Sequence, residues 1–269
     1  MATPPLLHHT SINPAGKPSI LFIHGAFGTG NDWDLVTPHL PPSYHILLPD
    51  LPGHGALAPT HPTFTSALSA STLATLIRQK AHSGRAHIVG LSLGAHVAID
   101  LACQYPDVCL DVLVSGFQIF EQSSALGRYM PQALYLQSRL ESFVPRSLMR
   151  SVMSGADIQP SYPSLELCKQ VGAPIASTEI EPKSKWPEPW LSRTLIIAAG
   201  KAGLLPTADH PDDAIKLAEM GRRGNAETVA YTHPGIRHPW NRQEPKLFAE
   251  LVVAWVERRE LPEGFVRLG

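Results

Sequence analysis

The segment from His87 to Ala95 constrains the fold of this 269-residue chain more than any other. It reads His-Ile-Val-Gly-Leu-Ser-Leu-Gly-Ala, an apolar run that enters a Gly-x-Ser-x-Gly motif and continues into a helical pattern. A sharp turn from strand to helix would hold Ser92 in a strained backbone conformation and expose its hydroxyl group. Glycine at positions 90 and 94 suits such a turn, because the strand and helix backbones approach closely there. The pattern predicts a nucleophilic serine at the end of a buried strand.

The rest of the chain alternates short apolar runs with helical patterns, which is typical of a mostly parallel sheet. We therefore expect an α/β fold of about seven or eight strands, with helices on both faces of the sheet. The expected strands are Ser19–His24, His45–Pro49, Ala86–Leu91, Cys109–Ser115, Arg193–Ala199 and Ala226–Tyr231, with an edge strand near Leu6–Thr10. Helical spacing marks Ala95–Ala102, Asp212–Gly221 and Phe248–Trp255.

The alternation is interrupted between Phe117 and Trp190. This stretch is rich in proline, serine, methionine and aromatic residues, and helical patterns occur within Ser124–Met153. We interpret residues 117–190 as a helical lid inserted into a single core domain, which residues 1–116 and 191–269 form. Its large side chains would either line a substrate pocket or pack the lid itself. These side chains are Met130, Met149, Met153, Tyr129, Tyr135 and Phe143.

Composition argues against several other classes of protein. The formal net charge is −1 and no basic cluster is present, so nothing favours binding to nucleic acid or to an anionic membrane. No apolar run reaches the length of a membrane span, and the N-terminal residues lack the pattern of a signal peptide. Three cysteines without metal-type spacing predict reduced thiols. We expect a cytoplasmic protein without a metal or organic cofactor, in an oligomeric state that the sequence does not predict.

Three further segments carry residues that acyl-transfer chemistry uses. Residues 24–28, His-Gly-Ala-Phe-Gly, form a tight turn after the first long strand, and the amide of Ala26 can serve as one donor of an oxyanion hole. The amide of Leu93 would be the other donor. Residues 50–55 read Asp-Leu-Pro-Gly-His-Gly after the next strand, and His238 precedes an amphipathic helix near the C-terminus.

In this order, the four motifs resemble those of the α/β-hydrolase superfamily, and the resemblance covers nearly the whole chain. The chain is most similar to small lidded serine esterases of the methylesterase and hydroxynitrile lyase type. The resemblance implies Ser92 as nucleophile, His238 as general base and acid, and the amides of Ala26 and Leu93 as oxyanion hole. His233 is the competing base, and His238 is favoured because Pro245 and a helix follow it.

The acid of the expected triad is where the chain departs from this family. The family places it shortly after the strand that ends at Ala199, where this chain has Gly203, and a second position used by some members holds Gly116. Asp209 is the nearest replacement, although its place before a helix is equally typical of an N-terminal cap. Further candidates are Asp212, Asp213 and Glu121.

Together these residues predict a serine hydrolase that cleaves a carboxylic ester or thioester of a small or medium apolar molecule. The missing family acid leaves open a second hypothesis, a lyase, cyclase or carbon–carbon bond-cleaving enzyme that uses Ser92 and His238 for proton transfer. A third hypothesis is a ligand-binding protein on a degenerate hydrolase scaffold. The expected partner is a small molecule in all three cases.

Overall fold

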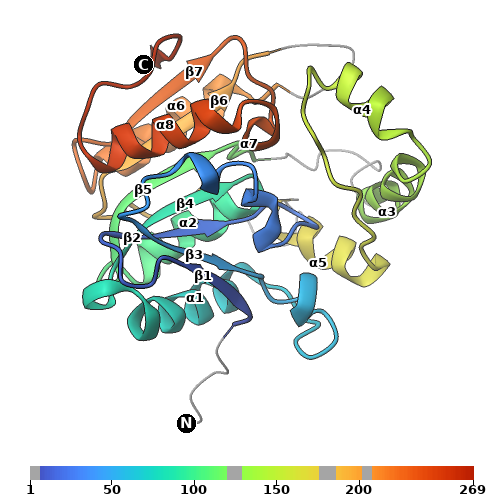
Figure 1. Cartoon of the computed structure of the whole chain (residues 1–269), viewed down its shortest axis with the longest axis horizontal. Helices are drawn as coiled ribbons and strands as arrows, with labels where there is room; N and C mark the ends of the chain where they lie inside the picture. Colours follow the sequence, from blue (N-terminus) through green and yellow to red (C-terminus); the bar gives the residue numbers. More distant parts are fainter. Residues whose placement is uncertain (1–6, 120–128, 176–185, 202–207) are drawn as a thin grey trace.

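An eight-stranded sheet forms the centre of the molecule (Figure 1). The computed structural model describes residues 7–119, 129–175, 186–201 and 208–269, without the side chains of residues 130 and 172–175. The strand order is β1-β3-β2-β4-β5-β6-β7-β8, and only the edge strands β1 and β8 pair antiparallel with their neighbours. The strands are β1 (His9–Ile12), β2 (Ser19–Ile23), β3 (His45–Pro49), β4 (Ala86–Leu91), β5 (Cys109–Ser115), β6 (Thr194–Ala199), β7 (Val229–His233) and β8 (Val266–Leu268).

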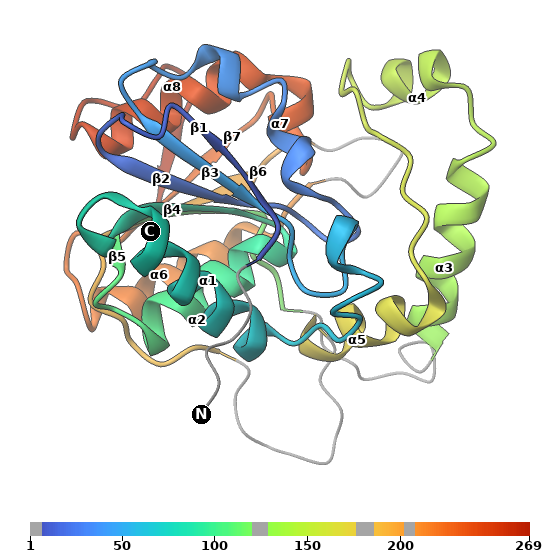
Figure 2. The same cartoon turned by 60° about the horizontal axis from the view of Figure 1, so that its bottom comes forward.

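Helices cover both faces of the sheet, so the expected α/β fold is confirmed. Figure 2 shows α1, α2 and α6 on one face and α8 on the other. The helices are α1 (Ser66–Lys80), α2 (Leu93–Gln104), α3 (Met130–Glu141), α4 (Arg146–Val152), α5 (Leu165–Ile175), α6 (Pro211–Arg222), α7 (Trp240–Gln243) and α8 (Pro245–Val256). In the part of the chain that the structure describes, no helix is long and apolar enough to cross a bilayer.

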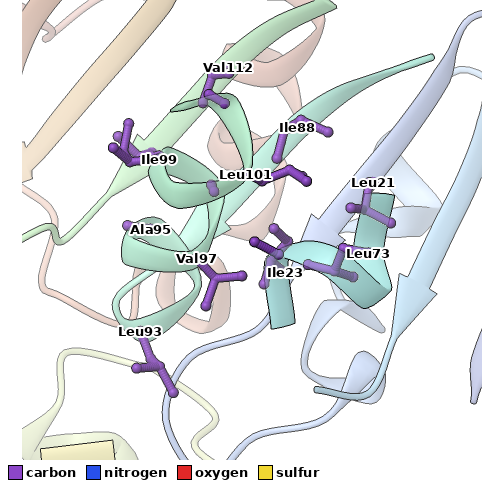
Figure 3. Packing of buried hydrophobic residues seen from close by; sticks show 14 of the residues in the cluster. Leu21, Ile23, Leu73, Ile88, Leu93, Ala95, Val97, Ile99, Leu101 and Val112 are labelled. Carbon is purple, nitrogen blue, oxygen red and sulfur yellow. The ribbon is translucent and has the colours of Figure 1, made fainter. Parts of the chain in front are cut away.

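The two helical layers explain why the central strands are apolar at consecutive positions rather than at alternate ones. Every residue of β2 is buried. Leu21 and Ile23 belong to the core layer that also contains Leu73 of α1 and Leu101 of α2 (Figure 3). Phe22 points to the opposite layer, where α8 packs. A strand covered on both faces needs apolar side chains in both directions.

Strands β3, β4 and β5 have the expected bounds, whereas β7 begins three residues later than expected. The expected strand Ala226–Tyr231 starts inside a turn. Asn225 forms that turn: its side-chain oxygen accepts a hydrogen bond from the amide of Glu227 at 2.9 Å, and its carbonyl accepts one from the amide of Thr228 at 3.0 Å. The β7 strand therefore covers Val229–His233.

Both edge strands differ from the sequence prediction. Strand β1 lies at His9–Ile12 instead of Leu6–Thr10, because its register pairs His9 with Pro49 and Ile12 with Ile46. Residues 1–6 lie outside the described part of the chain. Strand β8 was not expected, since three residues are too few for a periodic pattern, and it is recognisable only from its antiparallel pairing with β7.

The chain between β5 and β6 contributes α3, α4 and α5. In both views α3 and α4 lie beside the sheet rather than on one of its faces (Figures 1 and 2). The expected helical region Ser124–Met153 contains two helices, α3 and α4, and the turn between them ends at Pro145. Residues 124–128 of this region lie outside the described part of the chain. Helix α5 was not expected. It is held to the core by Gln170, whose side-chain oxygen accepts a hydrogen bond from the amide of Phe64 at 2.7 Å.

Candidate active site

Ser92 lies on the turn between β4 and α2 with a backbone conformation of φ 56° and ψ −117°. Non-glycine residues rarely adopt a positive φ, and such strain is typical of functional sites. The turn is possible because a Cβ atom at Gly90 would overlap the carbonyl of Gly94, and one at Gly94 would overlap the carbonyl of Ile23. The amide of Ser92 donates a hydrogen bond to Ser115 O at 2.8 Å, which ties the turn to β5. The strand, the turn and the helix therefore occur as expected from the sequence.

Two backbone amides were expected to form an oxyanion hole. Leu93 is the first residue of α2, and its side chain is buried in the core, so its backbone N–H lies at the positive end of the helix directly after Ser92. Ala26 lies in the turn after β2 and lines the same cavity as Ser92. The amide of Gly28 closes this turn with a hydrogen bond of 3.3 Å to Gly25 O.

His238 and Asp209 form a close pair. His238 Nδ1–H donates to Asp209 Oδ1 at 2.6 Å, which leaves Nε2 as the acceptor nitrogen of the neutral ring. The Asp209 side chain is 1% exposed and the His238 side chain 31% exposed. Burial lowers the pKa of His238, but the hydrogen bond and the charge of Asp209 more than compensate, so the pKa lies above its ordinary value. A buried carboxylate thus orients an accessible imidazole.

The backbone holds Asp209 in place although it stands ten residues beyond the end of β6. Its Oδ2 accepts a hydrogen bond from the amide of Ala199 at 2.8 Å, and its own amide donates to Ala199 O at 2.8 Å. Gln118 Nε2 donates to Oδ1 at 3.3 Å. The N-cap of α6 is His210, which makes no side-chain capping bond, so the alternative capping position does not fall on Asp209.

The other candidates for an acid lie elsewhere. Asp213 accepts a hydrogen bond from the amide of Ile119 at 3.2 Å, and Asp212 is exposed on the first turn of α6. Glu121 and Gly203 lie outside the described residues.

Gly116 contacts the ring of His238: a Cβ atom there would be 2.5 Å from Cε1 and 2.8 Å from Nδ1. The imidazole ring of His238 therefore fills the space that a side chain at position 116 would need.

A cavity of about 1070 Å³ joins these groups. Ser92 and His238 both line it, together with Ala26 of the turn after β2. The inserted region supplies another part of the wall through residues 158–164 and Leu167. The large side chains expected from the insertion do not line this cavity: Phe143 is 83% exposed, and Met149 and Met153 lie on α4 and directly after it. The Met130 side chain lies outside the described part.

Part of the cavity wall, here called the polar end of the cavity, is formed by Asp32, Asp34, Asn241 and Arg242, which the sequence did not predict. Arg242 forms ion pairs with Asp34 and Asp157. Asn241 Nδ2 donates to Asp32 O at 3.1 Å, and burial raises the pKa of the Asp32 carboxyl to about 6. In the sequence, these residues are indicated only by their proximity to two motifs. Asp32 and Asp34 follow the turn at residues 24–28, and Arg242 follows His238.

Three other histidines, His24, His54 and His233, contact neighbouring loops and side chains. His24 Nδ1–H donates to Gly25 O at 2.8 Å, and its Nε2 accepts from the amide of Leu51 at 3.0 Å, so the ring joins the loops after β2 and β3. Burial and the neighbouring His54 lower the pKa of His24 to about 3. His54 Nδ1–H donates to Pro52 O at 3.0 Å. His233, the competing base, accepts a hydrogen bond from the amide of Gly235 and packs on Phe265 instead of lining the cavity.

The cysteine thiols are poor candidates for the nucleophile. The thiols of Cys103, Cys109 and Cys168 are free, and burial raises the pKa of Cys103 and Cys109 to about 12. A thiol becomes a good nucleophile only when its pKa is lowered. Within the described ranges, no group of three or more histidine, cysteine or acidic side chains is arranged to hold a metal ion.

Comparison with known proteins shows which family the chain belongs to. Residues 20–251 match the model of the alpha/beta hydrolase family. An "AB hydrolase superfamily protein" from Gibberella zeae is 38% identical over 264 residues, which cover 96% of this chain and 86% of that protein. The chain therefore belongs to the α/β hydrolase family.

Two more distant matches differ in what they show. A 2-succinyl-6-hydroxy-2,4-cyclohexadiene-1-carboxylate synthase from Pectobacterium atrosepticum is 36% identical over 109 residues, 40% of this chain and 42% of that protein. A thermophilic esterase from Thermogutta terrifontis superposes with a TM-score of 0.66 at 18% identity, over 94% of this chain and 93% of that one. The second match supports the shared fold alone.

Proposed function

We propose that the protein is a serine hydrolase that cleaves a carboxylic ester or thioester of a small or medium apolar molecule. The observation that carries this proposal is that Ser92 and His238 line the same cavity, while the buried carboxylate of Asp209 holds the imidazole by a 2.6 Å hydrogen bond. The strained turn presents the hydroxyl, and the buried carboxylate sets the tautomer that a general base requires.

Acylation begins when Ser92 Oγ attacks the carbonyl carbon of the ester and its proton passes to His238 Nε2. The carbonyl oxygen becomes an oxyanion, which the amides of Ala26 and Leu93 stabilise. Asp209 stays ionised and stabilises the imidazolium through Nδ1–H. The intermediate then collapses: the bond to the leaving oxygen or sulfur breaks, and that group takes the proton from Nε2. An acyl group on Ser92 remains.

Deacylation repeats these steps with water as nucleophile. His238 Nε2 takes a proton from a water molecule, whose oxygen attacks the acyl carbon, and the oxyanion forms again at the same two amides. Collapse of the intermediate breaks the bond to Ser92 Oγ and returns the proton to that oxygen. The products are a carboxylic acid and the free enzyme. In this proposal residues 117–190 act as a lid, because residues 158–164 of that segment form part of the cavity wall.

The second candidate function is proton-transfer chemistry without net hydrolysis. Partial similarity to the Pectobacterium synthase favours it, since that name denotes a reaction other than ester hydrolysis. The polar end of the cavity would then hold a charged or hydroxylated substrate instead of an apolar one. The binding-protein hypothesis has no such support, because a binding protein needs neither the strained serine nor the oriented histidine.

Isotope labelling separates hydrolysis from its alternative. The purified protein is incubated with a panel of esters and thioesters in water enriched in oxygen-18, and the products are analysed by mass spectrometry. Hydrolysis places one oxygen atom from water in the carboxylic acid, because water is the second nucleophile. A product released without oxygen from water would favour the lyase or cyclase hypothesis and contradict the proposed function.

The pH dependence of kcat/KM should report on His238. The ring acts as a base only when neutral, and Asp209 raises its pKa above the ordinary value of 6.5. Activity is therefore expected to be lost as pH falls through a pKa above 6.5. In Asp209→Asn the charge that raises this pKa is absent while burial still lowers it, so the residual activity should decline only at a lower pH. If activity declined at the same low pH in the wild type and in Asp209→Asn, this result would contradict the role of Asp209 in raising the pKa of His238.

Substitution of Gly116 by alanine is expected to lower kcat by about 100-fold, because the new methyl group would displace the His238 ring from its position. Gly155→Ala is the matched control. Both glycines have a positive φ, 73° and 92°, but nothing lies within 4 Å of a Cβ atom at Gly155. Steady-state kinetics on both variants separates the clash from backbone strain. Equal losses of kcat would show that the contact with His238 is unimportant.

A further inference from the structure

One stretch of the inserted region reaches the cavity without a helix or strand of its own. Residues 154–164, here called the wall segment, run from the end of α4 to the start of α5, as Figure 2 shows. Residues 158–164 of this segment line the cavity that contains Ser92. Because no helix or strand fixes this backbone, its contacts with neighbouring parts of the chain determine where this part of the cavity wall lies.

The wall segment is attached to the core at the loop that carries His238. Arg237, directly before His238, donates from Nε to Ser154 Oγ at 3.0 Å. Arg242 follows four residues after His238. Its Nε donates to Asp157 O at 2.8 Å, and its carbonyl oxygen accepts a hydrogen bond from the amide of Asp157 at 3.2 Å. The same loop therefore carries the proposed general base and holds one part of the cavity wall.

The guanidinium of Arg242 connects three parts of the chain. Besides Asp157 O, it faces the carboxylate of Asp157 at 3.8 Å and Asp32 O at 3.4 Å, and it forms an ion pair with Asp34. Asp32 and Asp34 follow the turn at residues 24–28. The Arg242 side chain is only 6% exposed, and a buried charge of this kind needs its partners. Arg242 thus links the turn of the expected oxyanion hole, its own loop and the wall segment.

An arginine in the wall of a substrate cavity can instead bind a carboxylate of the substrate. In Arg242, however, each nitrogen of the guanidinium already faces an oxygen of the protein. Nε faces Asp157 O, Nη1 faces Asp34 and Asp32 O, and Nη2 faces the carboxylate of Asp157. An anionic substrate would have to displace one of these oxygens. The contacts therefore favour a positioning role over an anion site.

We propose that Arg242 is a positioning residue of this active site, which fixes the wall segment against the core and so shapes the cavity where the substrate binds. The inference rests on the proposed function of that cavity. The wall segment would contact the substrate both before and during the reaction, so its displacement should weaken substrate binding more than it slows the chemical step. His238 keeps its own attachment, the hydrogen bond to Asp209.

Steady-state kinetics with two esters of equal chain length tests this role. The 4-nitrophenyl ester of hexanoic acid is neutral, whereas the mono-4-nitrophenyl ester of adipic acid carries a carboxylate. For Arg242→Gln we expect KM to rise about tenfold with both esters, while kcat changes by less than about threefold. Asp157→Asn keeps the guanidinium and removes one of its charged partners, so KM should rise with both esters by a smaller factor.

Hydrogen exchange tests the attachment itself and needs no turnover. Peptides that cover the wall segment should exchange faster in Arg242→Gln than in the wild type, whereas peptides of β4 and β5 should exchange at unchanged rates. If the wild type hydrolyses neither ester, the proposed function fails, and hydrogen exchange still decides whether Arg242 holds the wall segment. Circular dichroism shows whether each variant is folded. Asp157→Asn, whose side chain is partly exposed, is used for both measurements if Arg242→Gln is not folded.

Arg193→Gln is the matched control for the loss of a buried arginine. The Arg193 side chain is 8% exposed, forms an ion pair with Asp111 at 3.0 Å and lies outside the cavity wall. Arg146→Gln removes the other cationic partner of Asp157 and leaves Arg242 in place. Both controls should leave KM unchanged.

Two results would overturn the proposal. A rise in KM confined to the anionic ester would show that Arg242 binds a carboxylate of the substrate instead. Unchanged exchange of the wall segment in the folded variant would show that Arg242 does not hold it.

Discussion

Replacing Ser92 by alanine is expected to lower kcat for ester hydrolysis by about 10⁶-fold, the loss found when the nucleophile of a serine protease is removed. Alanine keeps the backbone and the buried surroundings of the turn, but no oxygen remains to attack the carbonyl carbon. The free energy of unfolding should stay equal or rise slightly, since a polar group is removed from a site selected for chemistry rather than stability. Steady-state kinetics and chemical denaturation measure the two quantities.

Ser71→Ala is the matched control for this experiment. Ser71 lies on α1, outside the cavity wall, and its hydroxyl donates a hydrogen bond to the carbonyl of Leu68. Its loss should leave kcat unchanged. Retention of more than a trace of activity in Ser92→Ala would show that hydrolysis uses another nucleophile or none, which would contradict the proposed acyl-enzyme.

Replacing Asp209 by asparagine is expected to lower kcat by about 10⁴-fold, as in the serine protease triad. Asparagine is close to aspartate in size, but it has no charge to stabilise the imidazolium, and its NH2 group can leave His238 in the wrong tautomer. The backbone amide of Ala199 would still donate to the one remaining oxygen and hold the side chain in place, whereas Gln118 Nε2, which donates to Oδ1 in the wild type, would face the new NH2 group. Substrate affinity should change far less than kcat, because Asp209 is buried and does not line the cavity.

The control is Asp212→Asn, three residues further along the chain. Asp212 is exposed on the first turn of α6, so its neutralisation should leave kcat unchanged. Equal rates for Asp209→Asn and the wild type would show that the 2.6 Å pair is structural, and that His238 acts without an acid. Kinetic measurements on both variants at a pH well above the pKa of the histidine give the clearest comparison.

Features of the fold that depend on local pattern could be predicted from the sequence. Buried parallel strands such as β3, β4 and β5 are continuous apolar runs, and their bounds agree with expectation. The turn at Ser92 is a local arrangement of Gly90 and Gly94 and was equally predictable. Strand β8 depends on its pairing with β7, which lies far away in the chain, so no local pattern indicates it. Helix α5 does carry apolar residues at helical spacing, Leu167, Cys168 and Val171, which the sequence interpretation did not use.

The candidate acid shows the same limit within the site. The sequence places Asp209 before a helix, and a cap and a triad acid are then equally compatible with its position. Only the folded structure distinguishes the two roles, because the backbone amide of Ala199 binds one carboxylate oxygen and the other oxygen accepts from His238, which is 29 residues further along the chain. The polar end of the cavity is a similar case, because Arg242 meets Asp34 across more than two hundred residues.

Labelling with a fluorophosphonate probe tests the central claim most directly, since the probe reacts covalently only with an activated and accessible serine. The purified protein is treated with the probe, digested and analysed by peptide mass spectrometry, with Ser92→Ala treated in parallel. We predict a single adduct on the peptide that contains Ser92, formed faster as His238 loses its proton, and no adduct in the variant. A folded wild-type sample that remains unlabelled at every pH, or one labelled on a different serine, would contradict the assignment of Ser92 as nucleophile.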